Sequence, residues 1–193
     1  MKRKSWNEYL WIGELLYLFL GFFNIIFAWL GLIFMFTPLI MAIGGGNKNY
    51  CLKYCGKGQL FSVLGSRLKL SYGKRLPKFV ASTWFRYGFL TFFMTMFGIM
   101  LYSVGLVVAG AELREMVTLL WTFDVPWHWT NVAFVPTWVA QFSFGLYGIM
   151  VTSSILGFIG MVAFRPRTFC VFCPMGTMTQ GICKLKKEPK EEQ

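Results

Sequence analysis

The chain has 193 residues, of which 56% are hydrophobic, 19% aromatic and only 14% charged. A soluble domain carries about 25% charged residues, so this composition excludes an ordinary soluble enzyme, a disordered chain and a nucleic-acid-binding domain. It is typical of an integral membrane protein. The length is enough for one membrane domain of three to five helices.

Three apolar stretches are long enough to cross a bilayer, which takes about 20 residues. The predicted spans are residues 9–43, 84–111 and 138–164. The predicted tails and connecting segments are residues 1–8, 44–83, 112–137 and 165–193. We therefore expect an all-α integral membrane protein built as a single membrane domain.

The first stretch is unusually long for one span. As one helix, its 35 residues would be about 52 Å long, whereas the hydrocarbon core is about 30 Å thick. As a hairpin, each leg would have only about 15 residues, which is too short to span fully. The length favours one tilted helix, which we expect. The positive charges at Lys2, Arg3 and Lys4 favour the alternative, a broken hairpin that would make four helices.

The net charge of +11 is distributed by segment. Nine of the 19 Lys and Arg lie in residues 44–87, six in 164–193 and one in 112–137. By the positive-inside rule, residues 44–83 and 165–193 are expected on the cytoplasmic side of a prokaryotic inner membrane, and residues 112–137 on the other side. Tryptophans near the predicted span ends are expected in aromatic belts: Trp84, Trp121, Trp127, Trp129 and Trp138.

Four of the five cysteines form two closely spaced pairs. Cys51 and Cys55 follow the first span, and Cys170 and Cys173 follow the third. The cytoplasmic location expected for both pairs disfavours structural disulfides and favours metal ligation or transient redox chemistry. The fifth cysteine, Cys183, is a spare thiol, an alternative ligand or a lipidation site.

The two pairs belong to an internal repeat. Cys55-Gly56-Lys57-Gly58 aligns with Cys173-Pro174-Met175-Gly176. In each half, a span leads into a cysteine pair, a turn containing glycine and an amphipathic run, which predicts a short cytoplasmic helix after each motif. Backbone N–H groups in such turns can point at sulfur. Four thiolates at one surface suit a [4Fe–4S] cluster, a [2Fe–2S] cluster or Zn(II).

The motifs resemble those of NapH- and NosR-like membrane ferredoxin proteins, which carry paired Cys-x3-Cys-Pro sequences. Cys51–Cys55 has the x3 spacing, but Gly56 replaces the proline; Cys170–Cys173 keeps Pro174, but its spacing is x2. The order of motif, helix, external loop, helix and motif also matches, over residues 44–183. The additional ferredoxin-type tail and flavin domain of those families are missing. The resemblance implies electron transfer through or along the membrane, with reliance on partner subunits.

The sequence therefore predicts an iron–sulfur membrane subunit of a larger redox complex, itself non-catalytic. One [4Fe–4S] cluster near the cytoplasmic face is expected on Cys51, Cys55, Cys170 and Cys173. The alternatives are a zinc-stapled assembly subunit and a membrane thiol–disulfide oxidoreductase. Expected partners are the other subunits and the lipid bilayer, with quinone as a further candidate and no nucleic acid.

Two polar residues outside the cysteine motifs are candidates for function. Glu14 is the only acidic residue within an apolar stretch. We expect it solvated at headgroup level, with a proton or quinone role as the alternative. His128 is the only histidine, so this chain alone cannot provide two histidines to a haem. We expect it as an interfacial residue of the external loop.

Overall fold

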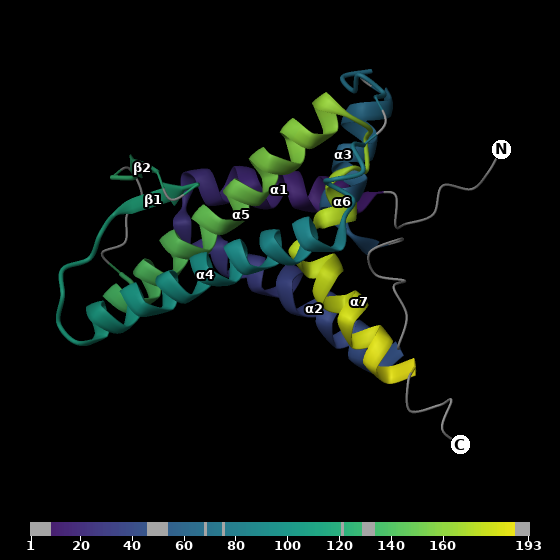
Figure 1. Ribbon diagram of the computed structural model, residues 1–193. Helices are drawn as coiled ribbons and strands as arrows, with labels where there is room; N and C mark the ends of the chain where they lie inside the picture. Colours follow the sequence, from purple (N-terminus) through teal and green to yellow (C-terminus); the bar gives the residue numbers. More distant parts are fainter. Residues whose placement is uncertain are drawn as a thin grey trace. The chain divides into compact units, whose positions relative to one another are not determined.

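The computed structural model describes residues 9–45, 54–67, 69–74, 76–120, 122–128 and 134–187. Most of them are helical (Figure 1). The elements in chain order are α1 (Leu10–Phe23), the 3-10 helix η2 (Ile25–Trp29), α2 (Leu30–Gly45), α3 (Gly56–Arg67), α4 (Thr83–Val108), β1 (Met116–Leu119), β2 (Phe123–Pro126), α5 (Thr137–Ala163), α6 (Phe169–Phe172) and α7 (Pro174–Lys187).

The chain forms two compact units. The first, here called the cysteine unit, consists of Met1–Leu15, Phe34–Leu90 and Leu156–Gln193. The second, the hairpin unit, consists of Leu16–Ile33 and Thr91–Ile155. The long helices contribute residues to both units, while both cysteine motifs fall within the first.

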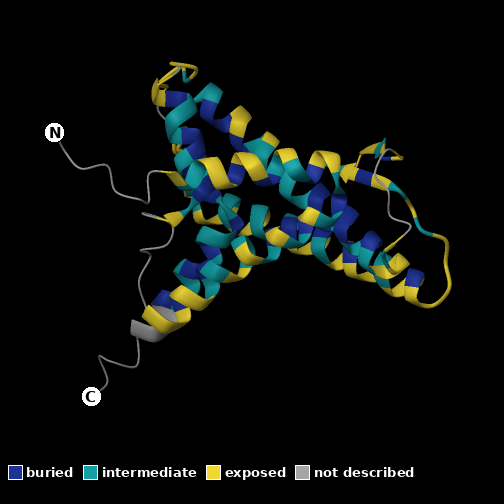
Figure 2. Cartoon of the chain, turned by 180° about the vertical axis from the view of Figure 1, so that it is seen from behind, coloured by how far each residue is buried: buried dark blue, intermediate teal, exposed yellow. Residues whose placement is uncertain are grey.

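Three helical segments are long and apolar enough to cross a membrane: Ile25–Gly45, Thr83–Val108 and Thr137–Ala163. The last two agree within three residues with the predicted spans 84–111 and 138–164. Large apolar side chains are exposed along these segments, including Ile40 and Val108, and exposed residues run along the helices in Figure 2. Such surfaces are suited to contact with lipid rather than water.

The first apolar stretch is not one helix, so that expectation is wrong. Asn24 has an extended backbone conformation, and its Oδ1 accepts a hydrogen bond from the Ile26 N–H at 3.1 Å. This side chain interrupts α1 and begins η2, because asparagine competes with helical hydrogen bonds. Residues 16–33 belong to the hairpin unit, whereas the flanking residues belong to the cysteine unit. The chain thus returns to the unit it left, and Ile25–Gly45 is the part of this stretch that is long enough to cross a membrane.

Aromatic side chains fill the centre of the cysteine unit. Phe61, Met161, Phe169 and Phe172 are buried together. Gly157 permits this packing, since a Cβ at that position would collide with the Phe61 ring. The segment after α3 is attached to the end of α5, where the Tyr72 N–H donates to the Val162 carbonyl at 3.0 Å and the Gly73 N–H donates to the Phe164 carbonyl at 2.9 Å. These contacts join segments from both halves of the sequence.

The hairpin unit contains a small antiparallel sheet, which the all-α expectation missed. β1 and β2 pair with Val117 opposite Val125. Val117 is buried against α5, and a Cβ at Gly148 would lie 2.7 Å from the Thr118 carbonyl oxygen. Each strand has only four residues, which is too short for a clear alternating pattern in the sequence.

The predicted aromatic belts need one correction. Trp127 is buried, and its ring packs edge-on against Tyr147 with a centroid distance of 5.7 Å. It therefore contributes to the protein core. Trp84 and Trp138 are exposed, as a belt requires, while Trp121 and Trp129 lie outside the described residues.

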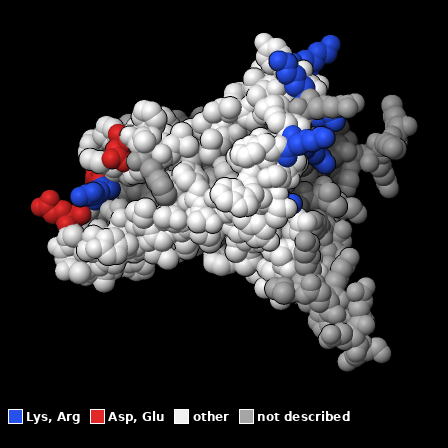
Figure 3. All heavy atoms as spheres, in the orientation of Figure 1, with Lys and Arg blue, Asp and Glu red and all other residues white. Residues whose placement is uncertain are grey.

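The described charges of the cysteine unit are mostly positive, whereas those of the hairpin unit are mostly negative. Figure 3 colours the Lys and Arg side chains blue and the Asp and Glu side chains red. The cations of the cysteine unit whose side chains the structure describes are Lys57, Arg67, Lys69, Lys74, Lys78, Arg86, Arg165 and Arg167. Its one described carboxylate is Glu14. The described charged groups of the hairpin unit are Arg114, Glu112, Glu115 and Asp124. Such segregation is the pattern that the positive-inside rule describes.

The return of the chain after Asn24 predicts that both termini lie on the same side of the membrane. We expect reporter fusions at the N-terminus and the C-terminus to give the same compartment signal in intact cells. A fusion inserted after Gly110, at the end of α4, serves as the control for the opposite side. Termini on opposite sides would show that residues 9–45 cross the membrane once, despite the break at Asn24.

Candidate cysteine site

Cys55 and Cys173 occupy equivalent positions at the starts of two helices. α3 begins directly after Cys55, and α7 begins directly after Cys173. The Gln59 N–H donates to the Cys55 carbonyl at 3.1 Å, and the Thr177 N–H donates to the Cys173 carbonyl at 2.9 Å. Both cysteines are therefore N-cap residues. The helices predicted after the two motifs are present.

The sulfur of Cys55 faces the first turn of its own helix. The Gly58 N–H donates to Cys55 Sγ at 3.4 Å. The first N–H groups of a helix have no carbonyl partner within the helix, and together with the helix dipole they stabilise negative charge.

Gly58 also brings Cys55 close to Cys170, which comes from α6. A Cβ at Gly58 would lie 3.2 Å from Cys170 Sγ and 3.7 Å from Cys55 Sγ. Both sulfurs therefore lie within 4 Å of the same position beside Gly58, although their residues are far apart in the sequence. A side chain larger than hydrogen at this position would occupy the space beside both thiols.

Cys173 lies one helical turn beyond Cys170 and borders the aromatic cluster of the cysteine unit. Gly176 stands in the second motif where Gly58 stands in the first. A Cβ at Gly176 would lie 3.7 Å from the Cys173 Cβ. Within the described part of the chain, three or more Cys, His, Asp or Glu side chains do not gather at metal-binding distances. Cys51, the fourth predicted ligand, lies outside that part. The structure thus brings together Cys55 and Cys170.

Phenylalanine rings surround the short helix that carries Cys170. Phe169 and Phe172 flank this cysteine in the sequence, and their ring centroids are 5.3 Å apart. Phe172 also packs edge-on against Phe85 at 5.7 Å and Phe89 at 5.1 Å, both from α4. These rings hold α6 in place and form the apolar cluster against which Cys173 packs.

Glu14 is buried, so the expectation of a solvated carboxylate at headgroup level is wrong. Its exposed fraction is 3%, and its Oε1 lies 3.8 Å from Lys57 Nζ. α1 and α3 approach closely because position 56 is glycine: a Cβ there would lie 3.3 Å from the Glu14 Cβ. The resulting ion pair ties α1 to the turn of α3 that follows Cys55. The sequence separation of Glu14 and Lys57 gave no sign of this pairing.

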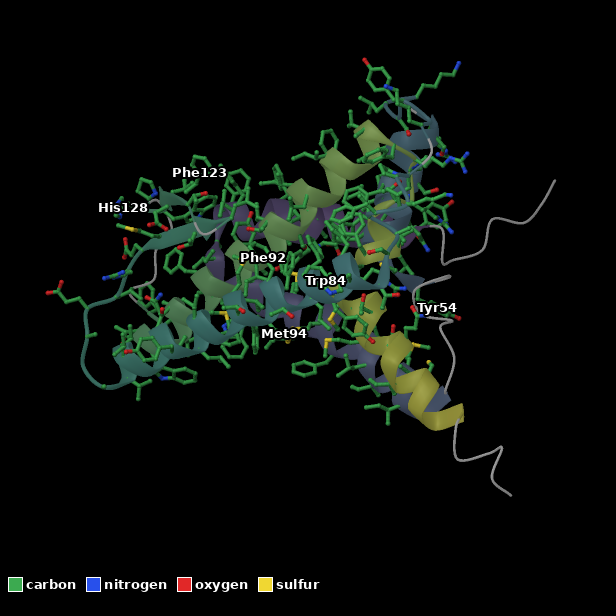
Figure 4. All side chains as sticks on the ribbon, viewed as in Figure 1. Tyr54, Trp84, Phe92, Met94, Phe123 and His128 are labelled. Carbon is green, nitrogen blue, oxygen red and sulfur yellow. The ribbon has the colours of Figure 1, made fainter. Side chains whose placement is uncertain are left out.

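Cys183 and His128 are the two remaining candidate residues of the sequence. Cys183 is buried in α7, ten residues after Cys173, which corresponds to about 15 Å along the helix. This spacing argues against Cys183 as a ligand beside Cys173. His128 belongs to the other unit, follows β2 and is exposed (Figure 4). Its Nδ1 lies 3.1 Å from Glu115 Oε2.

Comparisons with protein-family models, curated proteins and solved structures found no match for this chain. The resemblance to NapH- and NosR-like proteins therefore rests on the cysteine motifs and their order along the chain.

The buried ion pair predicts an asymmetric response to mutation. Lys57→Met leaves the Glu14 carboxylate buried without its cation, so we expect a loss of about 1–3 kcal/mol in the free energy of unfolding. Adding Glu14→Gln should restore part of that stability, because the charge that needed a partner is gone. Unfolding in detergent would measure both variants. Equal effects of the single and double variants would contradict the pairing.

Proposed function

We propose that this chain is an iron–sulfur membrane subunit that transfers electrons within a larger redox complex. One [4Fe–4S] cluster would be bound by Cys51, Cys55, Cys170 and Cys173. The approach of Cys55 and Cys170 to the same backbone position, Gly58, is the observation that carries the proposal. One cysteine from each sequence motif lies beside Gly58. Thiols without a shared role would have no reason to lie so close together.

The described residues fit such a cluster in three respects. The donors are thiols, which are the usual ligands of iron–sulfur clusters. Gly58 leaves the space beside both sulfurs open and directs an N–H toward Cys55 Sγ. The phenylalanine cluster limits water on one side. When bound, a cluster supplies one-electron transfer, while the chain holds it and adjusts its reduction potential through N–H···S hydrogen bonds and nearby positive charge.

The charge pattern supports a location for the site. The cysteine unit holds most of the described cations, so by the positive-inside rule it would face the cytoplasm of a prokaryotic cell. The apolar helices would anchor it in the inner membrane. A single cluster cannot carry electrons far, so partner subunits would supply the donor and acceptor. Quinone is a candidate for one of these roles.

The proposal predicts a specific cofactor content. Protein purified without air should contain about four iron and four acid-labile sulfide per chain and be brown, with the colour bleached by dithionite. Cys55→Ser, Cys170→Ser and Cys173→Ser should each lose most of the visible absorbance. Cys183→Ser is the matched control and should keep it.

Other outcomes would assign a different function. One zinc per chain without sulfide would indicate a structural anchor in which the thiols hold a metal that does no redox chemistry. Absence of metal after strict exclusion of air would favour a thiol–disulfide oxidoreductase. Full absorbance in both Cys55→Ser and Cys170→Ser would show that these residues are not ligands.

The glycine beside the two thiols predicts a second effect. Gly58→Ala places a methyl group 3.2 Å from Cys170 Sγ, so we expect cluster retention against an iron chelator to weaken by about 10–100-fold. Gly181→Ala in α7 is the matched control, because a Cβ there meets nothing within 4 Å. Equal retention in the two variants would mean that the space beside Gly58 is not needed for the cofactor.

A further inference from the structure

A second candidate site lies in the cysteine unit, on side chains other than the thiols. It is a pocket of about 220 Å³ formed by the start of α1, one face of α3 and the turn before α6. Its lining includes two arginines, two aromatic residues and two polar residues: Arg67, Arg167, Tyr9, Trp11, Gln59 and Ser62. None of the predicted cysteine ligands is among its lining residues.

Backbone packing brings the two arginines to this pocket. Gly65 of α3 contacts the turn at Pro166 so closely that a Cβ at Gly65 would lie 2.9 Å from the Pro166 Cβ. Arg67 follows Gly65 by two residues, and Arg167 is next to Pro166. Both arginine side chains therefore come from segments held in fixed contact, while remaining exposed enough to meet a ligand.

Among the residues that the structure describes, no acidic side chain lines the pocket. Glu14, the one described carboxylate of the cysteine unit, pairs with Lys57 instead. Guanidinium groups carry several donors in a planar fork that matches the oxygens of a phosphate group. The chemistry of the pocket therefore selects an anion, and phosphate suits it best.

An apolar surface adjoins the cationic one. α1 begins at this pocket, and its side chains Ile12 and Leu15 are 45% and 48% exposed. Tyr9 and Trp11, which line the pocket, are residue types that gather at the boundary between headgroups and acyl chains. A ligand with a phosphate at one end and hydrocarbon at the other would satisfy both surfaces.

We propose that this pocket binds the phosphate headgroup of an anionic phospholipid, with the acyl chains lying against the exposed side of α1. Basic pockets beside membrane helices are suited to such headgroups. This site is independent of the cluster, since it uses none of the proposed ligands. It would give the cysteine unit a fixed attachment at the surface of the bilayer.

The test uses the full chain, delipidated in detergent, with phosphatidylglycerol as the probe and native mass spectrometry as the readout. We expect Arg67→Gln/Arg167→Gln to bind phosphatidylglycerol at least about tenfold more weakly than the unmodified chain. Lys74→Gln/Lys78→Gln is the matched control: it removes the same charge from the same unit, outside the pocket lining, and should leave binding unchanged.

Three results would overturn the proposal. Equal weakening in both double variants would indicate diffuse attraction to a cationic surface. Equal binding of phosphatidylcholine would show that anionic lipid is not selected. Full displacement of the lipid by inorganic phosphate would assign the pocket to a soluble anion. Arg67→Lys/Arg167→Lys, which keeps the charge but loses the planar fork, provides a second variant and should bind with intermediate affinity.

Discussion

The cysteine unit depends on the close approach of neighbouring segments to the backbone of α3. Three glycines of this helix each meet a different partner: Gly56 meets α1, Gly58 meets the cysteine sulfurs and Gly65 meets Pro166. Glycine inside a helix costs about 1 kcal/mol relative to alanine. α3 would therefore be a poor helix in isolation, and its neighbours must stabilise it. The same glycines that weaken the helix make room for the contacts that define the thiol site and the arginine pocket.

Much of the fold follows from hydropathy and from the repeat. The spans at α4 and α5 are long apolar runs, and the helices after Cys55 and Cys173 follow from matching turns and amphipathic runs. The break at Asn24 does not follow in the same way, because one asparagine can either sit within a helix or cap a new one. The choice depends on a local hydrogen bond to Ile26 that no periodic pattern reveals. The β1–β2 pair was missed because each strand has only four residues, which is too short for a recognisable alternating pattern.

The candidate site was predictable in its residue types and only partly in its arrangement. The repeat identified the two cysteine motifs and the glycine in each turn, and the structure brings Cys55 and Cys170 together around Gly58. The partner of Glu14 and the placement of Arg67 and Arg167 at one pocket were not predictable. Both depend on contacts between distant segments, and single-residue properties do not encode which distant segment will be adjacent. In each case a glycine is the point of contact, at positions 56 and 65.

The cysteine unit is assembled from three separate parts of the chain, and the last of them begins at Leu156. During synthesis, Cys55 and its helix emerge long before Cys170 does. Cys55 is therefore present in the growing chain without Cys170 until α5 has been synthesised. Loading of any group shared by the two motifs becomes a late event in biogenesis. A ribosome stalled before residue 170 would leave a chain that lacks Cys170 and Cys173, and therefore half of the candidate thiol site.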